Sequence, residues 1–187
     1  VEESSKQQII LVTGSTSGLG RAVALSLAST GAHIIVHGRN RERGLEVINE
    51  IEQQGVGSAK FYAADLASFD QVREFAETIL RDYDRLDILI NNAAMGSWGM
   101  PSQVPLADRR KLMEVTLHAP VDLAQQVLPG MRERRSGWIL NLGSDSAWQP
   151  AVPYRDTPEA AHTIVIITAP ALGSPGTSTP RRLPSTT

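Results

Sequence analysis

The sequence has no cysteine, and its histidines are few and scattered. Without cysteine, the chain cannot form disulfides, use a thiolate as a nucleophile, or bind zinc or an iron–sulfur cluster through sulfur. The four histidines are His33, His37, His118 and His162, and no metal-ligand spacing emerges from them. We therefore expect neither a disulfide framework nor a metal site.

Strong net charge and long hydrophobic runs are also lacking. The 18 basic and 20 acidic residues leave a net charge of −2, which gives no general attraction to nucleic acid or to an anionic membrane. The longest apolar runs, at residues 9–12 and 164–167, are too short to cross a bilayer. The first residues do not show the basic-then-apolar pattern of a signal peptide. We expect a soluble, cytoplasmic protein without a nucleic-acid or membrane partner.

What is present is a regular alternation of short apolar runs and amphipathic stretches. Most of the apolar runs are apolar throughout, which is typical of parallel strands that are covered by helices on both faces. The pattern predicts an α/β fold with a doubly wound parallel sheet and a ligand site at the carboxyl ends of the strands. The expected strands are residues 8–12, 33–37, 59–63, 86–90 and 138–142, and the expected helices are residues 18–29, 41–54, 68–83 and 106–134.

Two regions of this pattern are less regular. Pro120 and Pro129 fall inside the last helical stretch, which predicts one long helix or two helices broken near these prolines. Seven of the eleven prolines follow residue 149. We therefore divide the chain into a domain at residues 1–150 and a Pro/Ser/Thr-rich tail at 151–187, expected to be largely disordered.

A glycine-containing loop, from Thr13 to Gly20, joins the first expected strand to the first expected helix. Glycines let backbone N–H groups face an anion without obstruction, and a helix N-terminus adds partial positive charge. An ordinary strand-to-helix turn would also explain three spaced glycines. Their position between a strand and a helix is the context that a dinucleotide-binding loop requires.

The ends of the second and third expected strands add two further candidates. Arg39, in Gly38-Arg39-Asn40, stands where NAD sites usually carry an acidic residue, and an arginine there suits the 2′-phosphate of NADP. A solvated basic loop is the alternative. Asp65 and Leu66 follow the third strand and could contact an adenine, although an aspartate of a turn or helix cap would look the same. We expect NADP as the cofactor, with NAD as the alternative.

Together these motifs resemble the short-chain dehydrogenase/reductase family over residues 8–148. The resemblance rests on the Thr-Gly-x-x-x-Gly-x-Gly loop, Asp65-Leu66, Asn91-Asn92-Ala93-Ala94 and the strand end Asn141-Leu142-Gly143-Ser144, which occur in the family's order. It implies a Rossmann-like fold, an NAD(P)(H) cofactor, and hydride transfer to or from a small carbonyl or alcohol substrate. The family often forms homo-oligomers, so one is possible here.

The resemblance also assigns roles to individual residues. The cofactor contacts that it implies are Gly14, Ser15, Thr16, Ser17, Gly18, Leu19 and Gly20 at the pyrophosphate, Arg39 with Asn40 at the 2′-phosphate, Asp65 with Leu66 at the adenine, and Asn92, Ala93 and Ala94 beside the nicotinamide ribose. Ala94 replaces a usual glycine, and Thr116 stands where the family commonly has its relay asparagine. Ser144 falls on the substrate-orienting serine.

The family's proton donor is missing from its usual setting. A tyrosine with a lysine four residues later normally protonates the substrate oxygen, but here Tyr154 is followed by Pro158, and all three lysines precede Ser144. Tyr154 is the remaining catalytic candidate, although it also fits an ordinary loop. Residues 163–168 resemble the family's sixth strand, too close to Tyr154 for a long helix between them. The fold is thus expected to be incomplete after the fifth strand. A catalytically impaired NADP-binding or partner-binding protein, or a truncated product, is therefore the alternative to an active oxidoreductase.

Overall fold

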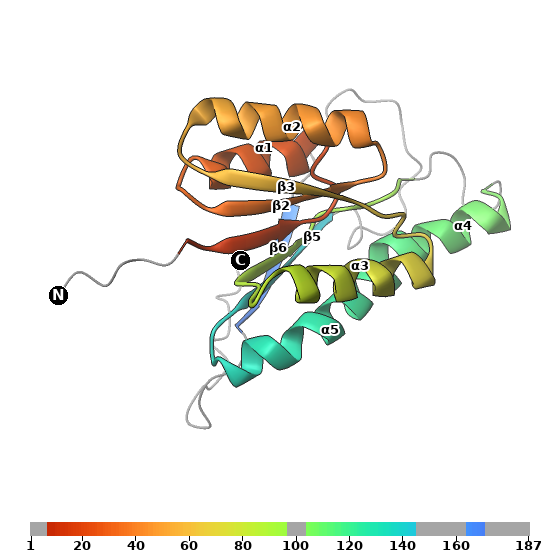
Figure 1. Ribbon diagram of the computed structural model, residues 1–187. Coiled ribbons are helices and arrows are strands. Elements are labelled where there is room, and N and C mark those ends of the chain that lie inside the picture. The colour runs from red at the N-terminus through yellow and green to blue at the C-terminus, as the bar shows by residue number, and fades with distance from the viewer. Residues whose placement is uncertain (1–6, 97–103, 145–163, 171–187) are drawn as a thin grey trace, which may run out of the picture.

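The computed structural model describes residues 7–96, 104–144 and 164–170, and it contains one six-stranded sheet (Figure 1). The strand order is β3-β2-β1-β4-β5-β6. The first five strands are parallel to one another, as the sequence predicts, and their order reverses between β1 and β4. The strands are β1 Ile9–Val12, β2 His33–Gly38, β3 Ser58–Ala63, β4 Ile88–Asn91, β5 Trp138–Ser144 and β6 Ile164–Pro170.

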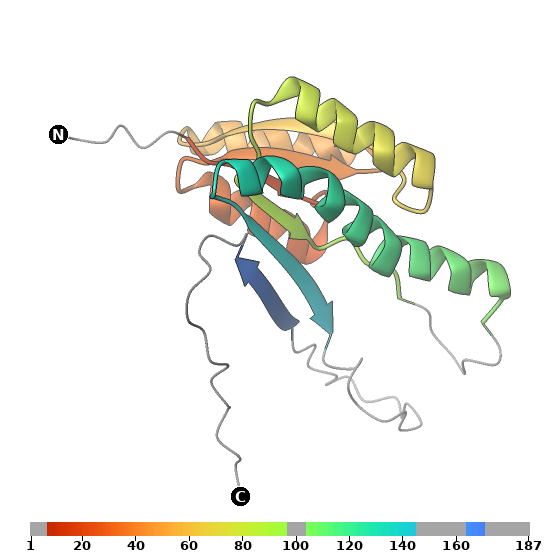
Figure 2. The same cartoon turned by 90° about the horizontal axis from the view of Figure 1, so that it is seen from below.

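The sixth strand comes from the segment that the sequence assigns to the tail. It pairs antiparallel with β5 along the whole of that strand, from Trp138 opposite Pro170 to Ser144 opposite Ile164. Figure 2 shows the two arrows side by side and pointing in opposite directions at the edge of the sheet. The parallel sheet is therefore complete through the fifth strand and is extended by one strand of reversed direction. The domain boundary near residue 150 stays a prediction.

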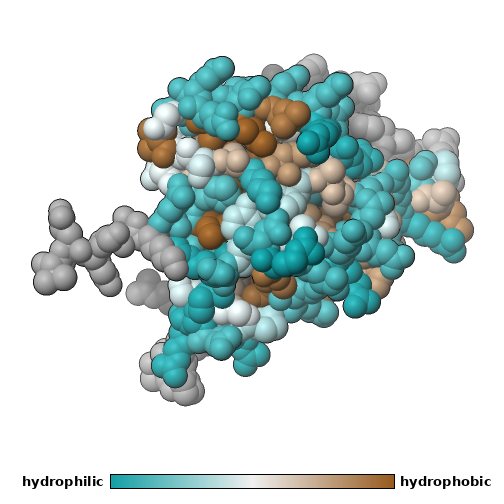
Figure 3. Space-filling model, viewed as in Figure 1, coloured by the Kyte–Doolittle hydropathy of each residue, from teal (hydrophilic) through white to brown (hydrophobic). Residues whose placement is uncertain are grey.

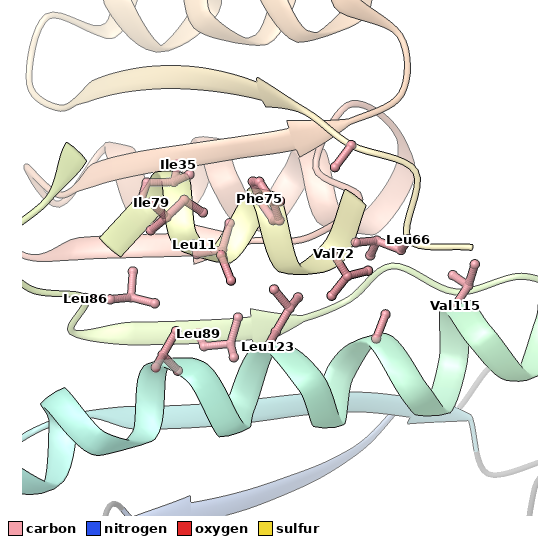
Figure 4. Packing of buried hydrophobic residues seen from close by; sticks show 14 of the residues in the cluster. Leu11, Ile35, Leu66, Val72, Phe75, Ile79, Leu86, Leu89, Val115 and Leu123 are labelled. Atoms are coloured by element: carbon pink, nitrogen blue, oxygen red, sulfur yellow. The ribbon is translucent and has the colours of Figure 1, made fainter. Parts of the chain in front are cut away.

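Helices cover the sheet on both faces (Figures 1 and 2). The helices α1, Gly18–Ala28, and α2, Arg41–Gln54, pack on one face, and α3, Phe69–Asp82, and α5, Ala119–Glu133, pack on the other. Alternate residues of each strand face opposite layers. Ile10 and Val12 belong to the core with α1 and α2, whereas Leu11 belongs to the core with α3 and α5. Figure 4 shows the second of these cores. Burial on both faces explains the apolar runs in the central strands β1, β2 and β4, whereas the outer strand β3 has no buried residue.

One continuous helical rod precedes β5. It consists of α4, Leu106–Met113, a π-helical segment, Glu114–His118, and α5. The helix is broken neither at Pro120 nor at Pro129, so the single long helix is the correct one of the two expected forms. Ala119 N–H donates to the Glu114 carbonyl oxygen, five residues back. This wider turn lies next to Pro120, which has no N–H to donate and whose ring would crowd a regular α-turn.

The surface seen in Figure 3 is mainly hydrophilic, with hydrophobic atoms near α2 in the upper part of the view and at the outer end of α4. Within residues 7–96, 104–144 and 164–170, none of the helices has the length and apolar character needed to cross a membrane.

Candidate functional site

A cleft of about 300 Å³ opens at the carboxyl ends of β1, β2 and β4, where the strand order reverses. This is the position that the doubly wound fold favours for ligands. The cleft brings together the glycine loop, the end of β2, the segment between β3 and α3, and the segment after β4. Its lining residues are Gly14, Thr16, Ser17, Leu19, Gly20, His37, Gly38, Arg39, Ala64, Asp65, Leu66, Asn92, Ala93, Ala94, Met95 and Val115.

The glycine loop presents an uncovered helix N-terminus to this cleft. Gly14 and Gly18 have φ of +65° and +54°, which only glycine adopts without strain. A Cβ at Gly18 would meet nothing within 4 Å, so the loop faces open space there. Ser17, the N-cap of α1, makes no side-chain capping bond, and the first turn of α1 contains no acidic residue. The partial positive charge of the helix end is therefore not neutralised by its own side chains.

The segment after β4 holds the glycine loop in place. Asn92 Nδ2 donates to the carbonyl oxygens of Thr13, at 2.8 Å, and Gly14, at 3.2 Å. In return, Thr13 Oγ1 accepts the backbone N–H groups of Asn92 and Ala93, each at 3.0 Å. A Cβ on Gly20 would lie 2.3 Å from Asn92 Nδ2, so the asparagine fits only against a glycine. Asn92 thus lines the cleft and also fixes the loop geometry.

His37 supports the loop from beneath. Its side chain is buried, with the imidazole Nδ1 3.1 Å from Gly14 N and Nε2 3.2 Å from the Ala64 carbonyl oxygen. Gly14 N–H must donate to Nδ1, so Nδ1 is unprotonated and Nε2 carries the hydrogen that it donates to Ala64. Burial lowers the pKa of His37 to about 4, against the smaller opposing effects of the Ala64 carbonyl and Asp65. The imidazole is therefore neutral near pH 7.

Two residues of the predicted loop differ in orientation. Ser15 is buried, its N–H donates to the His37 carbonyl oxygen at 2.9 Å, and its Oγ accepts the His37 N–H at 3.0 Å. Its side chain therefore faces the sheet. Thr16 lines the cleft and packs closely on Gly38, where a Cβ would meet the threonine side chain at 2.5 Å. The bond pattern makes Ser15 a support of the loop, and a direct cofactor contact by its side chain stays a prediction.

The end of β2 places one positive charge at the rim of the cleft. Arg39 is exposed and lines the cleft. Asn40 follows it, but its Oδ1 accepts the backbone N–H of Arg43 at 2.9 Å and so caps α2. Among the lining residues, Asp65 is the one carboxylate and it lies on the segment after β3. The predicted 2′-phosphate position therefore has an arginine at the end of β2, and the carboxylate of the cleft lies on a different segment.

Asp65 makes a hydrogen bond within a turn and also lines the cleft. Its Oδ1 accepts the N–H of Ala67 at 3.1 Å, and its own N–H donates to Gln71 Oε1 at 2.9 Å. The next residue, Leu66, is buried at the edge of the core, with 5% of its surface exposed. Both line the cleft. The bond to Ala67 agrees with the alternative of a turn aspartate, and the adenine contact stays a prediction.

The catalytic candidates Ser144 and Tyr154, and Thr116, which was predicted among the cofactor-binding residues, are less well defined. Thr116 lies in the π-helical segment, is exposed, and its Oγ1 donates to the Leu112 carbonyl oxygen at 2.6 Å. It does not line the cleft, whereas its neighbour Val115 does. Ser144 is the last residue of β5, at the carboxyl edge of the sheet. Tyr154 lies outside the described residues. The roles of Thr116, Ser144 and Tyr154 stay predictions.

Sequence reasoning missed several residues that line the cleft, among them His37, Met95 and Val115. A polar residue at the end of an otherwise apolar strand, directly before Gly38, was the signal available for His37. Its bonds to Gly14 and Ala64 connect residues 23 and 27 positions away, which no local pattern reveals. In the described parts of the chain, no three histidine, aspartate or glutamate side chains lie where they could hold a metal ion.

Comparisons with known proteins agree with this geometry. The family model of short chain dehydrogenases matches residues 8–154. An uncharacterized oxidoreductase of Bacillus subtilis, YvrD, is 34% identical over 160 residues, which are 83% of this chain and 59% of that protein. A dehydrogenase/reductase of the same family from Danio rerio, member 7B, is 32% identical over 80% of this chain and 50% of its own length. The chain thus spans only about half to three fifths of these curated relatives.

Solved structures give the same result. A metagenomic short-chain oxidoreductase in complex with NADP is 35% identical, has a TM-score of 0.73, and is matched over 78% of this chain and 64% of its own. The residues matched by the family model include all of β1 to β5. The chain belongs to the short-chain dehydrogenase/reductase family.

Proposed function

We propose that this protein binds NADP(H) in the cleft at the carboxyl ends of β1, β2 and β4, and that it is an oxidoreductase for a small carbonyl or alcohol substrate. The single observation that carries the proposal is the open glycine loop at the N-terminus of α1. Gly18 faces empty space and Ser17 leaves the helix N–H groups uncapped, so a phosphate can approach the backbone closely.

The residues present fit such a cofactor. The glycine loop would hold the pyrophosphate, Arg39 the 2′-phosphate, Asp65 with Leu66 the adenine, and the segment Asn92–Ala94 the ribose of the nicotinamide. When bound, NADP(H) supplies or accepts the hydride. The protein's own part in this half of the site is to bind and orient, through backbone donors and one guanidinium group.

NADP is preferred over NAD for an electrostatic reason. The one charged side chain at the end of β2 that lines the cleft is Arg39, and a guanidinium group binds a phosphate in two-pronged fashion. A carboxylate at this position would instead accept bonds from the free ribose hydroxyls of NAD. The NADP complex of the 35% identical metagenomic relative supports the same preference.

The substrate half of the proposal rests on fewer residues. Ser144 would orient the substrate oxygen from the end of β5, and Tyr154 would be the proton donor. The second candidate function, an NADP-binding protein without turnover, is favoured by one specific observation. The chain has no lysine after Lys111, so the tyrosine-lysine pair of the family is absent. A homo-oligomer likewise stays a prediction.

Calorimetric titration with NADP⁺ and NAD⁺ tests the binding step. The wild type should bind NADP⁺ more tightly than NAD⁺. Arg39→Ala should weaken NADP⁺ binding by about tenfold to a hundredfold, the effect of losing a charge-assisted hydrogen-bonded pair of about 1.5–3 kcal/mol, and leave NAD⁺ binding within about twofold. Arg132→Ala, an exposed arginine on α5, is the matched control and should change neither affinity. Absence of heat with both nucleotides would refute the proposal.

Oxidation of NADPH by a panel of aldehydes and ketones then separates the two candidate functions. An active oxidoreductase consumes NADPH with at least one carbonyl, and Ser144→Ala abolishes the consumption while NADP⁺ still binds. Tight NADP⁺ binding with no consumption across the panel would instead establish the protein as a nucleotide-binding member without turnover.

A further inference from the structure

We propose that His37 is a positioning residue whose neutral imidazole joins the glycine loop to the segment before Asp65 and holds both in the form that binds the nucleotide. This inference rests on the proposed function and deepens it, because it assigns part of the affinity for the nucleotide to a buried side chain that supports the glycine loop from the wall of the cleft. His37 lies at the end of β2, directly before Gly38 and Arg39.

The hydrogen bonds of the imidazole connect two of the segments that form the cleft. One ring edge accepts from Gly14 N–H in the pyrophosphate loop, and the opposite edge donates to Ala64, next to the predicted adenine contacts. The backbone of His37 also exchanges two bonds with Ser15. One residue thus ties β2 to the glycine loop and to the segment after β3.

The packing around the His37 imidazole fixes its orientation, and so fixes the positions of its two hydrogen-bond partners relative to each other. Only 2% of the His37 surface is exposed, and the Phe75 ring of α3 lies against the imidazole with 4.7 Å between the ring centroids. A planar ring carries its acceptor and its donor on opposite edges at a fixed separation. A side-chain amide carries both on one flexible end, so it can replace one of these bonds but not the pair.

The function of this ring depends on its protonation state. A protonated imidazole has N–H groups on both nitrogens, so Nδ1 would face Gly14 N–H as donor against donor, and the loop would have to move. The charged groups around the ring are few. The segment after β3 contributes Asp65, whose charge favours the protonated form, and β2 is followed by the exposed Arg39. The glycine loop and α3 contribute the uncharged Ser15 and Phe75. Burial outweighs Asp65 and keeps the ring neutral.

Three substitutions separate the two bonds. His37→Asn places an amide oxygen where Nδ1 stands and keeps the acceptor for Gly14. His37→Gln places an amide nitrogen where Nε2 stands and keeps the donor for Ala64. His37→Phe keeps a ring of similar shape, so it fills the space without either bond. His118→Asn, an exposed histidine on the rod before β5, is the matched control.

The first readout is amide hydrogen exchange of Gly14 in the free protein, followed by NMR. The Gly14 amide should be protected in the wild type, in His37→Asn and in His118→Asn, and should lose at least tenfold in protection in His37→Gln and His37→Phe. The Gly14 amide shift should also titrate together with the His37 ring nitrogens, well below pH 6. Measuring the free protein avoids the titration of the cofactor's own phosphate near pH 6.

The second readout is NADP⁺ affinity at pH 7.5, measured at a temperature where circular dichroism shows every variant to be folded. His37→Phe should weaken binding by about tenfold or more, with His37→Asn closest to the wild type among the three. Equal Gly14 protection or equal affinity in wild type and His37→Phe would overturn the positioning role. If the wild type binds neither nucleotide, the proposed function and the affinity role both fail, and Gly14 exchange alone decides whether His37 orders the loop.

Discussion

Replacing Gly20 by alanine tests the contact on which the glycine loop depends. Gly20 lies inside α1, where helix propensity alone makes alanine better than glycine by about 1 kcal/mol. The structure predicts the opposite sign. A Cβ at this position would lie 2.3 Å from Asn92 Nδ2 and 2.5 Å from the Gly14 carbonyl oxygen, and a backbone atom cannot yield as a flexible side chain does.

The magnitude follows from what must move. Asn92 must leave its place and give up its bonds to Thr13 and Gly14, each of which contributes about 1 kcal/mol. Overpacking against Gly14 costs about 1–3 kcal/mol more. After the gain in helix propensity, the net loss in the free energy of unfolding is about 2–4 kcal/mol. NADP⁺ affinity should fall as well, because the displaced loop is the proposed phosphate site.

Urea unfolding followed by circular dichroism measures this loss, with Gly18→Ala as the matched control. Gly18 has open space around it but a left-handed φ of +54°, so alanine there costs only about 1–2 kcal/mol of backbone strain. In an Asn92→Ala background, the loss caused by Gly20→Ala should shrink, because one of the two clashing groups is gone. A Gly20→Ala protein as stable as the wild type would refute the packing described for this loop.

Three further predictions concern stability, each measured as the free energy of unfolding in urea. The pKa of His37 lies near 4 in the folded protein and near 6.5 in the unfolded chain, so the unfolded chain binds the proton first as pH falls. About 3 kcal/mol of the free energy of unfolding should therefore be lost between pH 6.5 and 4. A His37→Gln protein should lose less over this range, and an equally steep loss in both would contradict a buried neutral imidazole. Phe75→Ala should cost about 3–5 kcal/mol, because Phe75 is only 4% exposed. Phe69→Ala is the control and should cost under about 1 kcal/mol, because Phe69 is 53% exposed. Similar losses in the two variants would show that the core is not packed as described. Asn40→Ala should cost about 1 kcal/mol through the lost cap of α2 and Asn40→Ser much less, so equal losses would assign Asn40 another role.

The sequence was sufficient for those parts of the fold that depend on local patterns. The strand β1, the loop from Thr13 to Gly20 and the helix α1 follow one another within some twenty residues, and glycine spacing and apolar runs are enough to predict them. The helix cap at Asn40 also has a local cause, the N–H three residues later, although Asn40 was predicted as a cofactor contact and its capping role was not.

The supports of the site could not be predicted in the same way. Asn92 reaches the glycine loop across 78 and 79 residues, and His37 reaches it across 23, so their roles exist only once the sheet has formed. Proline was also an ambiguous signal. At Pro120 the sequence allowed a helix break, whereas the structure accommodates the ring with a single wider turn. Local propensity indicates where a regular helix is difficult and does not say which irregular form replaces it.

That wider turn sets the rotational phase of the rod before β5. A π-turn holds one residue more than an α-turn, and each residue of an α-helix rotates the following side chains by about 100°. Removing a single residue from Glu114–His118 would therefore turn the whole of α4 about its axis relative to α5 without shortening the rod by more than about 1.5 Å. Val115 would then leave the wall of the cleft while the buried face of α5 stayed in place. The extra residue works as an angular adjustment, which lets Val115 face the cleft while the buried side of α5 faces the sheet.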